Sequence, residues 1–262
     1  METITTRGRS VDIPVCVGEL TPAQYEYYCF LAFALGGGVI DLDYFRVRWF
    51  SYLIGLKKVG YTILKPEHIA ELDRQRKVID GFFRTQTVNG VERQSLDFAT
   101  TVNLLPEYKG FKGPGDWLDG ITFGEFVQCL TIFESLAEAD AEGVAEGYAD
   151  IARVLYHIPG ESSVPDLIAF HAPTLFSSVW SAIQSGPIDI NGKKIDLRII
   201  FRSSGGSRPD DKTGWAGITF EVATAGLFGT VKEVEAADFW EVLLYLYKCK
   251  FEYINDKNNS QK

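Results

Sequence analysis

The sequence predicts a mainly α-helical protein of the α+β kind, built from two related helical hairpins and a C-terminal helix, with two short β-hairpins. Three observations support this fold class. Two apolar stretches, 20–55 and 121–159, each begin with a threonine helix cap and contain a break between two helices. Asn-Gly pairs at 89–90 and 191–192 lie between strand-like segments, as in type I′ hairpins. Apolar residues recur at helical spacing over 236–254.

The first helical hairpin has a defined start, turn and end. Thr21 is a good N-cap, and Gln24 at the third helical position can bond back to the cap residue, which makes a capping box. The glycines at 36–38 end the first helix, Asp41 can cap the second, and Gly55 ends it. Thr122 and Glu125 repeat the capping box in the second hairpin.

The remaining elements follow from changes of pattern along the chain. Residues 1–10 are polar and are expected to be frayed, and 11–17 alternates weakly as an edge strand would. The loop 96–120 is rich in glycine, and Trp117 is expected to anchor it on the core. Further helices are expected over 66–83, 171–185 and 213–226, and the second β-hairpin over 188–198.

These elements group into two domains and a tail. Residues 11–95 hold the first helical hairpin, a third helix and the first β-hairpin. Residues 96–254 hold the second helical hairpin, the second β-hairpin and the C-terminal helices. Residues 255–262 are polar and are expected to be disordered.

Composition limits the classes of function. The net charge of −9 argues against nucleic acid or an anionic membrane as the main partner, because both repel an acidic surface. No apolar run reaches the roughly 18 residues needed to cross a bilayer, and no segment is typical of a signal peptide. The four cysteines form no CxxC pair, which indicates reduced thiols and an intracellular location.

No catalytic motif is present. The histidines, His68, His157 and His171, never occur as HExxH or beside a cysteine, and there is no GxSxG or phosphate-binding glycine pattern. Two carboxylate pairs, Asp116/Asp119 and Asp210/Asp211, are candidates for hydrolytic chemistry, although turn and capping roles explain them adequately. We therefore predict no catalytic, cofactor-binding or metal-binding residues, and no cofactor.

The C-terminal helix holds the candidate interface. Trp240, Tyr247 and Phe251 belong to a heptad-like seam, while other apolar residues form a second face of the same helix. A helix with two apolar faces either lies centrally in the fold or presents one face to another chain. We expect Trp240, Tyr247 and Phe251 to form the interface if one exists.

Three segments together resemble uncharacterised proteins encoded in tail gene clusters of Bacteroidetes phages and prophages. These segments are ELTPAQYEYYCFLAFALGGGVIDLDYFRVRWFSYLIG, ITFGEFVQCL with VLYHIPG, and KTGWAGITFEVATAGLFGT with FWEVLLYLYKCK. The matching patterns are helix caps and core positions, so the resemblance implies no functional residues. Proteins of this kind are similar in setting to tail assembly chaperones or minor tail components.

The sequence therefore favours a non-catalytic protein that acts by protein–protein contacts in phage tail assembly, as a chaperone or a minor structural subunit. The expected partners are other tail proteins, such as the tape-measure protein, or a second copy of the chain. The expected location is the cytoplasm of a bacterial host, or the virion. The alternative is a small soluble host enzyme that depends on a metal or ligand. A polar pocket that collects Asp116, Asp119 or His157 would favour that alternative.

Overall fold

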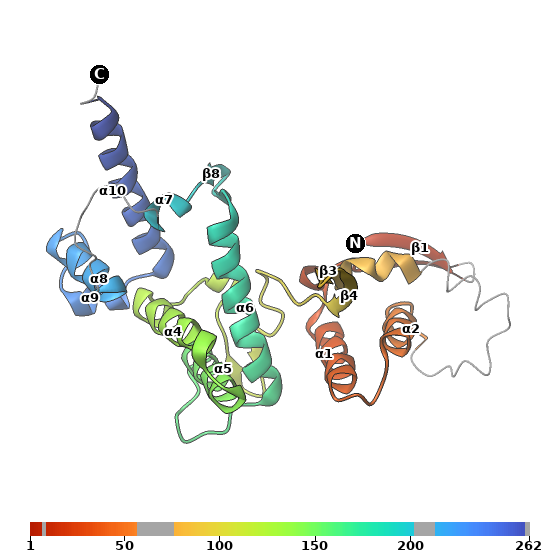
Figure 1. The fold of residues 1–262 in the computed structure, drawn as a ribbon. Helices are drawn as coiled ribbons and strands as arrows, with labels where there is room; N and C mark the ends of the chain where they lie inside the picture. The colour runs from red at the N-terminus through yellow and green to blue at the C-terminus, as the bar shows by residue number, and fades with distance from the viewer. Residues whose placement is uncertain (7–8, 57–75, 202–212, 260–262) are drawn as a thin grey trace. The chain divides into compact units, whose positions relative to one another are not determined.

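The computed structural model describes residues 1–6, 9–56, 76–201 and 213–259. The chain divides into two compact units, Met1–Thr100 and Thr101–Lys262. Helices dominate both, and the strands of the described residues pair only as two-stranded antiparallel sheets (Figure 1). The predicted fold class, mainly α with an α+β character, is confirmed. No helix in the described part of the chain combines the length and the apolar character needed to cross a membrane.

The first unit contains the predicted helical hairpin, formed by α1 (Pro22–Gly36) and α2 (Leu42–Leu53). The Thr21 hydroxyl accepts a hydrogen bond from the Gln24 amide at 3.3 Å, and the Gln24 side chain accepts one from the Thr21 amide at 2.9 Å. The Asp41 carboxylate accepts a hydrogen bond from the Tyr44 amide at 2.7 Å. The capping box and the second cap are therefore confirmed.

Two antiparallel pairs of strands complete the first unit. The predicted hairpin is present as β3 (Phe83–Val88) and β4 (Val91–Leu96). The N-terminal residues were expected to be frayed, but β1 (Glu2–Thr6) pairs with β2 (Arg9–Ile13). That prediction was wrong because the cross-strand partner, which supplies the backbone hydrogen bonds, gives no signal in the polar residues themselves.

The helix predicted over 66–83 was wrong in its last part. The described portion is a 3-10 helix, Arg76–Phe82, and Phe83 already belongs to β3. The rest of this prediction falls on 57–75, outside the described residues. A second short 3-10 helix, Val17–Glu19, precedes α1.

Tyr28 lies at the centre of the aromatic packing of the first unit. Its ring lies 5.1 Å from the Trp49 ring, in the edge-to-face arrangement that aromatic pairs favour, and 5.5 Å from the Phe82 ring, both between centroids. Its hydroxyl lies 3.1 Å from the Phe82 carbonyl oxygen and 3.0 Å from that of Asp97. Burial raises the pKa of the Tyr28 phenol.

The second unit is built on the helices α4, α5 and α6, which pack side by side, and on α10 (Figure 1). Thr122 and Glu125 form the second capping box, with bonds of 3.2 and 2.7 Å, as predicted. The helices of this unit are α4 (Phe123–Ser135), α5 (Ala141–Leu155), α6 (Asp166–Ser185), α7 (Arg198–Phe201), α8 (Gly214–Thr224), α9 (Val231–Ala236) and α10 (Phe239–Asn259).

Three boundaries differ from those expected. Helix α6 begins at Asp166, five residues before the predicted start, because Leu167 and Ile168 extend its buried face by one turn. The second β-hairpin is present as β7 (Ile188–Ile190) and β8 (Lys193–Ile195), but the chain then turns into α7. Helix α10 continues through Asn259, so residues 255–259 are helical although disorder was expected.

The loop before α4 is mostly irregular, as predicted. It contains a two-residue ladder, β5 (Glu107–Tyr108) with β6 (Phe111–Lys112), and a 3-10 turn, Asp116–Leu118. The core beneath it centres on Phe126, whose ring stacks on that of Phe239 at 4.2 Å.

The starts of α4 and α10 are joined by backbone hydrogen bonds. The Phe123 amide donates to the Ala237 carbonyl at 2.8 Å, and the Phe239 amide donates to the Ile121 carbonyl at 3.2 Å. These bonds bring the start of α10 to the loop that precedes α4, and so determine where the candidate site lies.

Candidate functional site

The second unit contains an open cavity of about 540 Å³ with two tryptophans in its wall. We call it the tryptophan pocket. It is formed by the loop before α4, the hairpin β7–β8 and the start of α10. Its described lining residues are Asp116, Trp117, Asp119, Ile188, Asp189, Ile190, Asn191 and Trp240.

The loop holds Trp117 in an unusual backbone conformation. Trp117 and Leu118 have φ angles of 57° and 61°, in the left-handed region that bulky residues rarely adopt. The Trp117 amide donates to the Thr101 carbonyl at 2.7 Å, and the Gly115 amide donates to the Asp119 carbonyl at 2.7 Å. These bonds hold the turn, which presents the Trp117 side chain to the pocket. Backbone strain of this kind is typical of functional sites.

Trp240, at the start of α10, forms the part of the wall next to Trp117. The Asp238 carboxylate accepts hydrogen bonds from the amides of Trp240 and Glu241, at 2.9 and 3.1 Å. The Trp240 indole N–H donates to the Trp117 carbonyl at 3.1 Å, and the two rings meet at 6.5 Å and 65°. Trp117 also packs against the core, so the predicted anchoring of its loop is confirmed.

The β7–β8 hairpin forms the third side. Its turn is the predicted Asn-Gly type, with φ angles of 52° at Asn191 and 76° at Gly192. The Asp189 carboxylate accepts a hydrogen bond from the Gly192 amide at 2.8 Å, which stabilises the turn.

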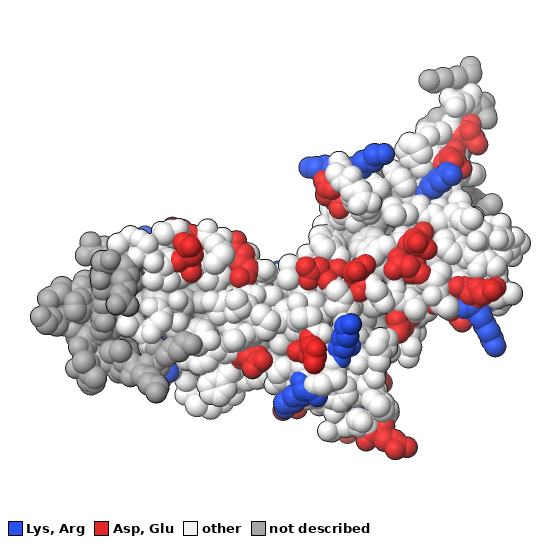
Figure 2. Space-filling model, turned by 180° about the vertical axis from the view of Figure 1, so that it is seen from behind, with Lys and Arg blue, Asp and Glu red and all other residues white. Residues whose placement is uncertain are grey.

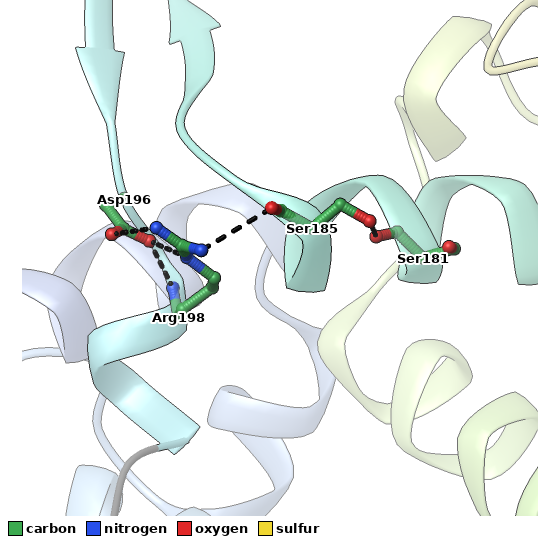
Figure 3. Close-up of polar contacts among 4 residues, drawn as sticks. All are labelled: Ser181, Ser185, Asp196 and Arg198. Atoms are coloured by element: carbon green, nitrogen blue, oxygen red, sulfur yellow. Dashed lines mark hydrogen bonds and ion pairs between the residues drawn. The ribbon is translucent and has the colours of Figure 1, made fainter.

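The base of this hairpin is held to the end of α6. The Arg198 guanidinium makes two hydrogen bonds to the Asp196 carboxylate, at 2.7 and 2.8 Å, and a longer one of 3.4 Å to the Ser185 carbonyl (Figure 3). The Ser185 hydroxyl in turn donates to the Ser181 carbonyl within α6, at 2.6 Å. The forked Arg198–Asp196 contact has the bidentate geometry that fixes orientation, and the Arg198–Ser185 hydrogen bond links the chain after β8 to the end of α6.

The charge of the pocket is negative. Asp116, Asp119 and Asp189 are exposed at its wall, and the described lining includes no lysine or arginine. The Asp116 carboxylate accepts a hydrogen bond from the Asn103 amide at 2.9 Å, whereas the Asp119 carboxylate makes no hydrogen bond or ion pair with the described residues. On the face shown in Figure 2, carboxylates predominate over lysines and arginines.

A buried polar network joins the loop before α4 to the core. The Asn103 side chain donates to the Pro114 carbonyl at 2.7 Å, and its oxygen lies 2.9 Å from Nε2 of His171. Because a carbonyl oxygen can only accept, Nε2 carries the proton. Tyr156 donates to the Leu105 carbonyl at 2.9 Å. Burial lowers the pKa of His171 to about 3, so its ring is neutral near pH 7.

The structure distributes the residues singled out from the sequence over several places. Asp116 and Asp119 come together with Trp240 in the tryptophan pocket. His157 lies outside it, exposed, with Nδ1 3.4 Å from a Glu125 carboxylate oxygen. His171 belongs to the buried network. The pair Asp210/Asp211 and His68 lie outside the described residues.

The three candidate interface residues occupy one face of α10, and we call them the α10 face. Trp240 and Tyr247 are partly buried against the core, whereas Phe251 is 48% exposed. The Tyr247 and Phe251 rings stack at 5.9 Å. In Figure 1 the C-terminal half of α10 extends beyond α7 and α8. The face therefore runs from the pocket wall to exposed rings.

Sequence reasoning did not find the contribution of Trp117 to the pocket, nor that of Ile188 and Ile190. No local pattern joins these segments, since they meet only through the tertiary contacts described above. Within the described residues, no group of three or more histidine, cysteine, aspartate or glutamate side chains is placed to hold a metal ion.

Comparison with protein families found no match, and comparisons with curated proteins and with solved structures also found none.

Proposed function

We propose that this protein is a non-catalytic, phage- or prophage-derived protein that acts by protein–protein contacts in tail assembly, as a chaperone or a minor structural subunit. The observation that carries the proposal is the half-exposed Phe251 ring stacked on Tyr247. Aromatic side chains dominate the energetics of protein interfaces, because they bury a large apolar area with few rotatable bonds. The resemblance to phage tail-cluster proteins supplies the biological setting.

The α10 face has the features of a binding surface for a polypeptide. Its exposed end offers rings that a partner can cover, and its other end reaches the tryptophan pocket. The acidic balance of the chain, with a net charge of −9, favours solubility and a basic partner. The proposed partners are the tape-measure protein, other tail proteins or a second copy of the chain, in the cytoplasm of a bacterial host or in the virion.

Two experiments separate the chaperone from the structural subunit. A chaperone should keep the tape-measure protein of the neighbouring gene soluble on co-expression. Equal solubility of that protein without this chain would contradict the chaperone version. A structural subunit should instead be found in purified particles by mass spectrometry, and its absence from them would contradict that version.

The α10 face itself is tested by substitution. Tyr247→Glu should weaken partner binding or self-association by at least tenfold, because it places a charge among rings that a partner would cover, and the monomer should stay folded. Tyr253→Glu is the matched control, since Tyr253 is 50% exposed on the same helix and about 120° around it. Equal effects of the two substitutions on binding, or unfolding by Tyr247→Glu, would show that the α10 face is not an interface.

The pocket also supports a second candidate function, that of a metal- or ligand-dependent enzyme. The specific observation is that Asp116 and Asp119 line one cavity. Both carboxylates are exposed, whereas catalytic sites usually exclude water. A thermal-shift screen with divalent cations and small metabolites would raise this candidate if any compound raised the Tm in wild type but not in Asp119→Asn.

A further inference from the structure

We infer that the tryptophan pocket binds a lysine or arginine side chain of the partner polypeptide. This inference rests on the proposed function, because it assumes a polypeptide partner and assigns the part of that partner that enters the pocket. Four features of the second unit support it: the size of the cavity, its indole rings, its charge and its position at the end of the α10 face.

The cavity is large enough for a long side chain and remains open to solvent. Its volume of about 540 Å³ lies within the range of small-ligand sites, roughly 300–1,000 Å³. Ile188 and Ile190 provide apolar wall for an aliphatic stem. Lysine and arginine place such a stem against apolar surface while the charged head group bonds elsewhere.

The two indoles favour a cation. Trp117 and Trp240 meet at an interplanar angle of 65°, so they do not stack face to face. The electron-rich face of tryptophan is the best side-chain partner for an ammonium or guanidinium group. The indole N–H of Trp240 is already used by the Trp117 carbonyl, so it does not donate to an incoming group.

The negative charge of the pocket wall has no cationic partner among the described lining residues. Asp119 is the clearest case, since its exposed carboxylate makes no hydrogen bond or ion pair among the described residues. Lys194 lies across the hairpin from Asp189, but the ion pairs of the described residues do not join them. A ligand cation would therefore supply the missing positive charge, and an anion would be repelled.

The position of the pocket favours a polypeptide over a free amine. Trp240 and Phe251 are eleven positions apart on one face of α10, a rise of about 16 Å. An extended chain covers that distance in about five residues. A partner segment with a basic residue and an apolar residue about five positions apart would thus engage both ends of the α10 face.

The test uses the whole 262-residue chain labelled with ¹⁵N on tryptophan, so that NMR resolves the indole groups. N-acetyl-lysine amide and N-acetyl-arginine amide should shift the Trp117 and Trp240 indole signals saturably, with Kd values in the millimolar range expected for one side chain. N-acetyl-norleucine amide, which lacks the charge, should bind at least tenfold more weakly. Half-molar salt should weaken the lysine complex severalfold.

Substitutions connect the signal to the pocket. Asp119→Asn should weaken binding of the lysine amide three- to tenfold without changing the Tm, because its carboxylate makes no hydrogen bond or ion pair with the described residues. Glu161→Gln, an exposed carboxylate outside the pocket, is the control and should have no effect. Equal binding of lysine and norleucine amides, or unchanged binding by Asp119→Asn, would overturn the inference.

Two peptides test whether the ligand of the pocket is a polypeptide. Acetyl-Lys-Ala-Ala-Ala-Ala-Phe-amide should bind at least threefold more tightly than the same peptide with alanine in place of phenylalanine, and Tyr247→Glu should remove only that gain. Tighter binding of the polyamine spermidine than of both peptides would assign the pocket to a free amine and overturn the inference. If no cationic probe binds while the tape-measure protein is still kept soluble, the pocket assignment fails and the proposed function stands. If the probes bind but no tail protein does, the proposed function fails.

Discussion

Acidification should destabilise the second unit through one buried histidine. His171 is fully buried, and its Nε2 donates to the Asn103 side chain at 2.9 Å. Burial disfavours the charged ring and lowers the pKa of His171 to about 3. The folded protein therefore holds this ring neutral at a pH where an unfolded chain would protonate it.

The size of the effect follows from the two pKa values. An unfolded histidine titrates near 6.5, so below about pH 6.5 the unfolded state binds more protons than the folded state. The stability that the neutral ring provides is complete above pH 6.5 and is lost progressively as the pH falls towards the folded pKa of about 3. Lowering the pH from 8 to 5 should cost about 2 kcal/mol of the free energy of unfolding.

Urea unfolding at pH 8 and pH 5, followed by tryptophan fluorescence, measures this cost. Four of the five tryptophans belong to the second unit, so the signal reports mainly on that unit. The His171→Gln variant can still donate an amide N–H to Asn103 but cannot titrate, so it should lose about 2 kcal/mol less than wild type between the two pH values. His157→Gln is the control, because His157 is exposed.

One result would refute this reasoning. If wild type and His171→Gln lost the same free energy of unfolding between pH 8 and pH 5, to within about 0.5 kcal/mol, the His171 ring could not be held neutral by burial. A smaller loss in His157→Gln than in His171→Gln would assign the acid sensitivity to the exposed histidine instead.

Two further predictions concern stability. Gly113→Ala should lower the free energy of unfolding by about 1–3 kcal/mol, because a Cβ would lie 2.6 Å from the Tyr156 ring. Gly160→Ala is the control: its Cβ would meet no atom within 4 Å, so it should change the free energy of unfolding by less than about 0.5 kcal/mol. Equal urea midpoints for the two variants would contradict this. Thr122→Ala should lower the free energy of unfolding by about 1 kcal/mol, because the helix loses its cap. Thr122→Ser keeps a hydroxyl at this position and should restore the lost stability. An unchanged urea midpoint in Thr122→Ala would show that the cap contributes nothing.

The parts of the fold that the sequence predicts well depend on contacts within a few residues. The capping boxes at Thr21 and Thr122 each join residues three positions apart. The Asn-Gly turns at 89–90 and 191–192 take the positive φ angles that these residue types tolerate. Such signals need no knowledge of the rest of the chain, and all four were confirmed.

The parts that could not be predicted depend on distant partners. The polar strand β1 is stable only because β2 pairs with it. The tryptophan pocket joins Trp117 to Trp240, which are 123 positions apart. The sequence singled out Asp116, Asp119 and Trp240 for separate reasons, but no periodicity or spacing indicates that they share a cavity.

The buried network and the pocket depend on the same loop. The Asp116 carboxylate accepts a hydrogen bond from the backbone N–H of Asn103 at 2.9 Å, while the side-chain oxygen of Asn103 accepts one from His171 in the core. The strained turn at Trp117 therefore lies directly beyond residues fixed by buried hydrogen bonds, which can offset the cost of its positive φ angle. A second proton on His171 would bind Nδ1, because Nε2 already carries one, and it would place a positive charge in the core beside Asn103, which is bonded to the loop that carries Trp117. The Trp117 indole signal should accordingly broaden or shift at a higher pH than the one at which the second unit unfolds. If the Trp117 indole signal changed at the same pH as the second unit unfolds, the loop and the core would respond to acid as one cooperative structure.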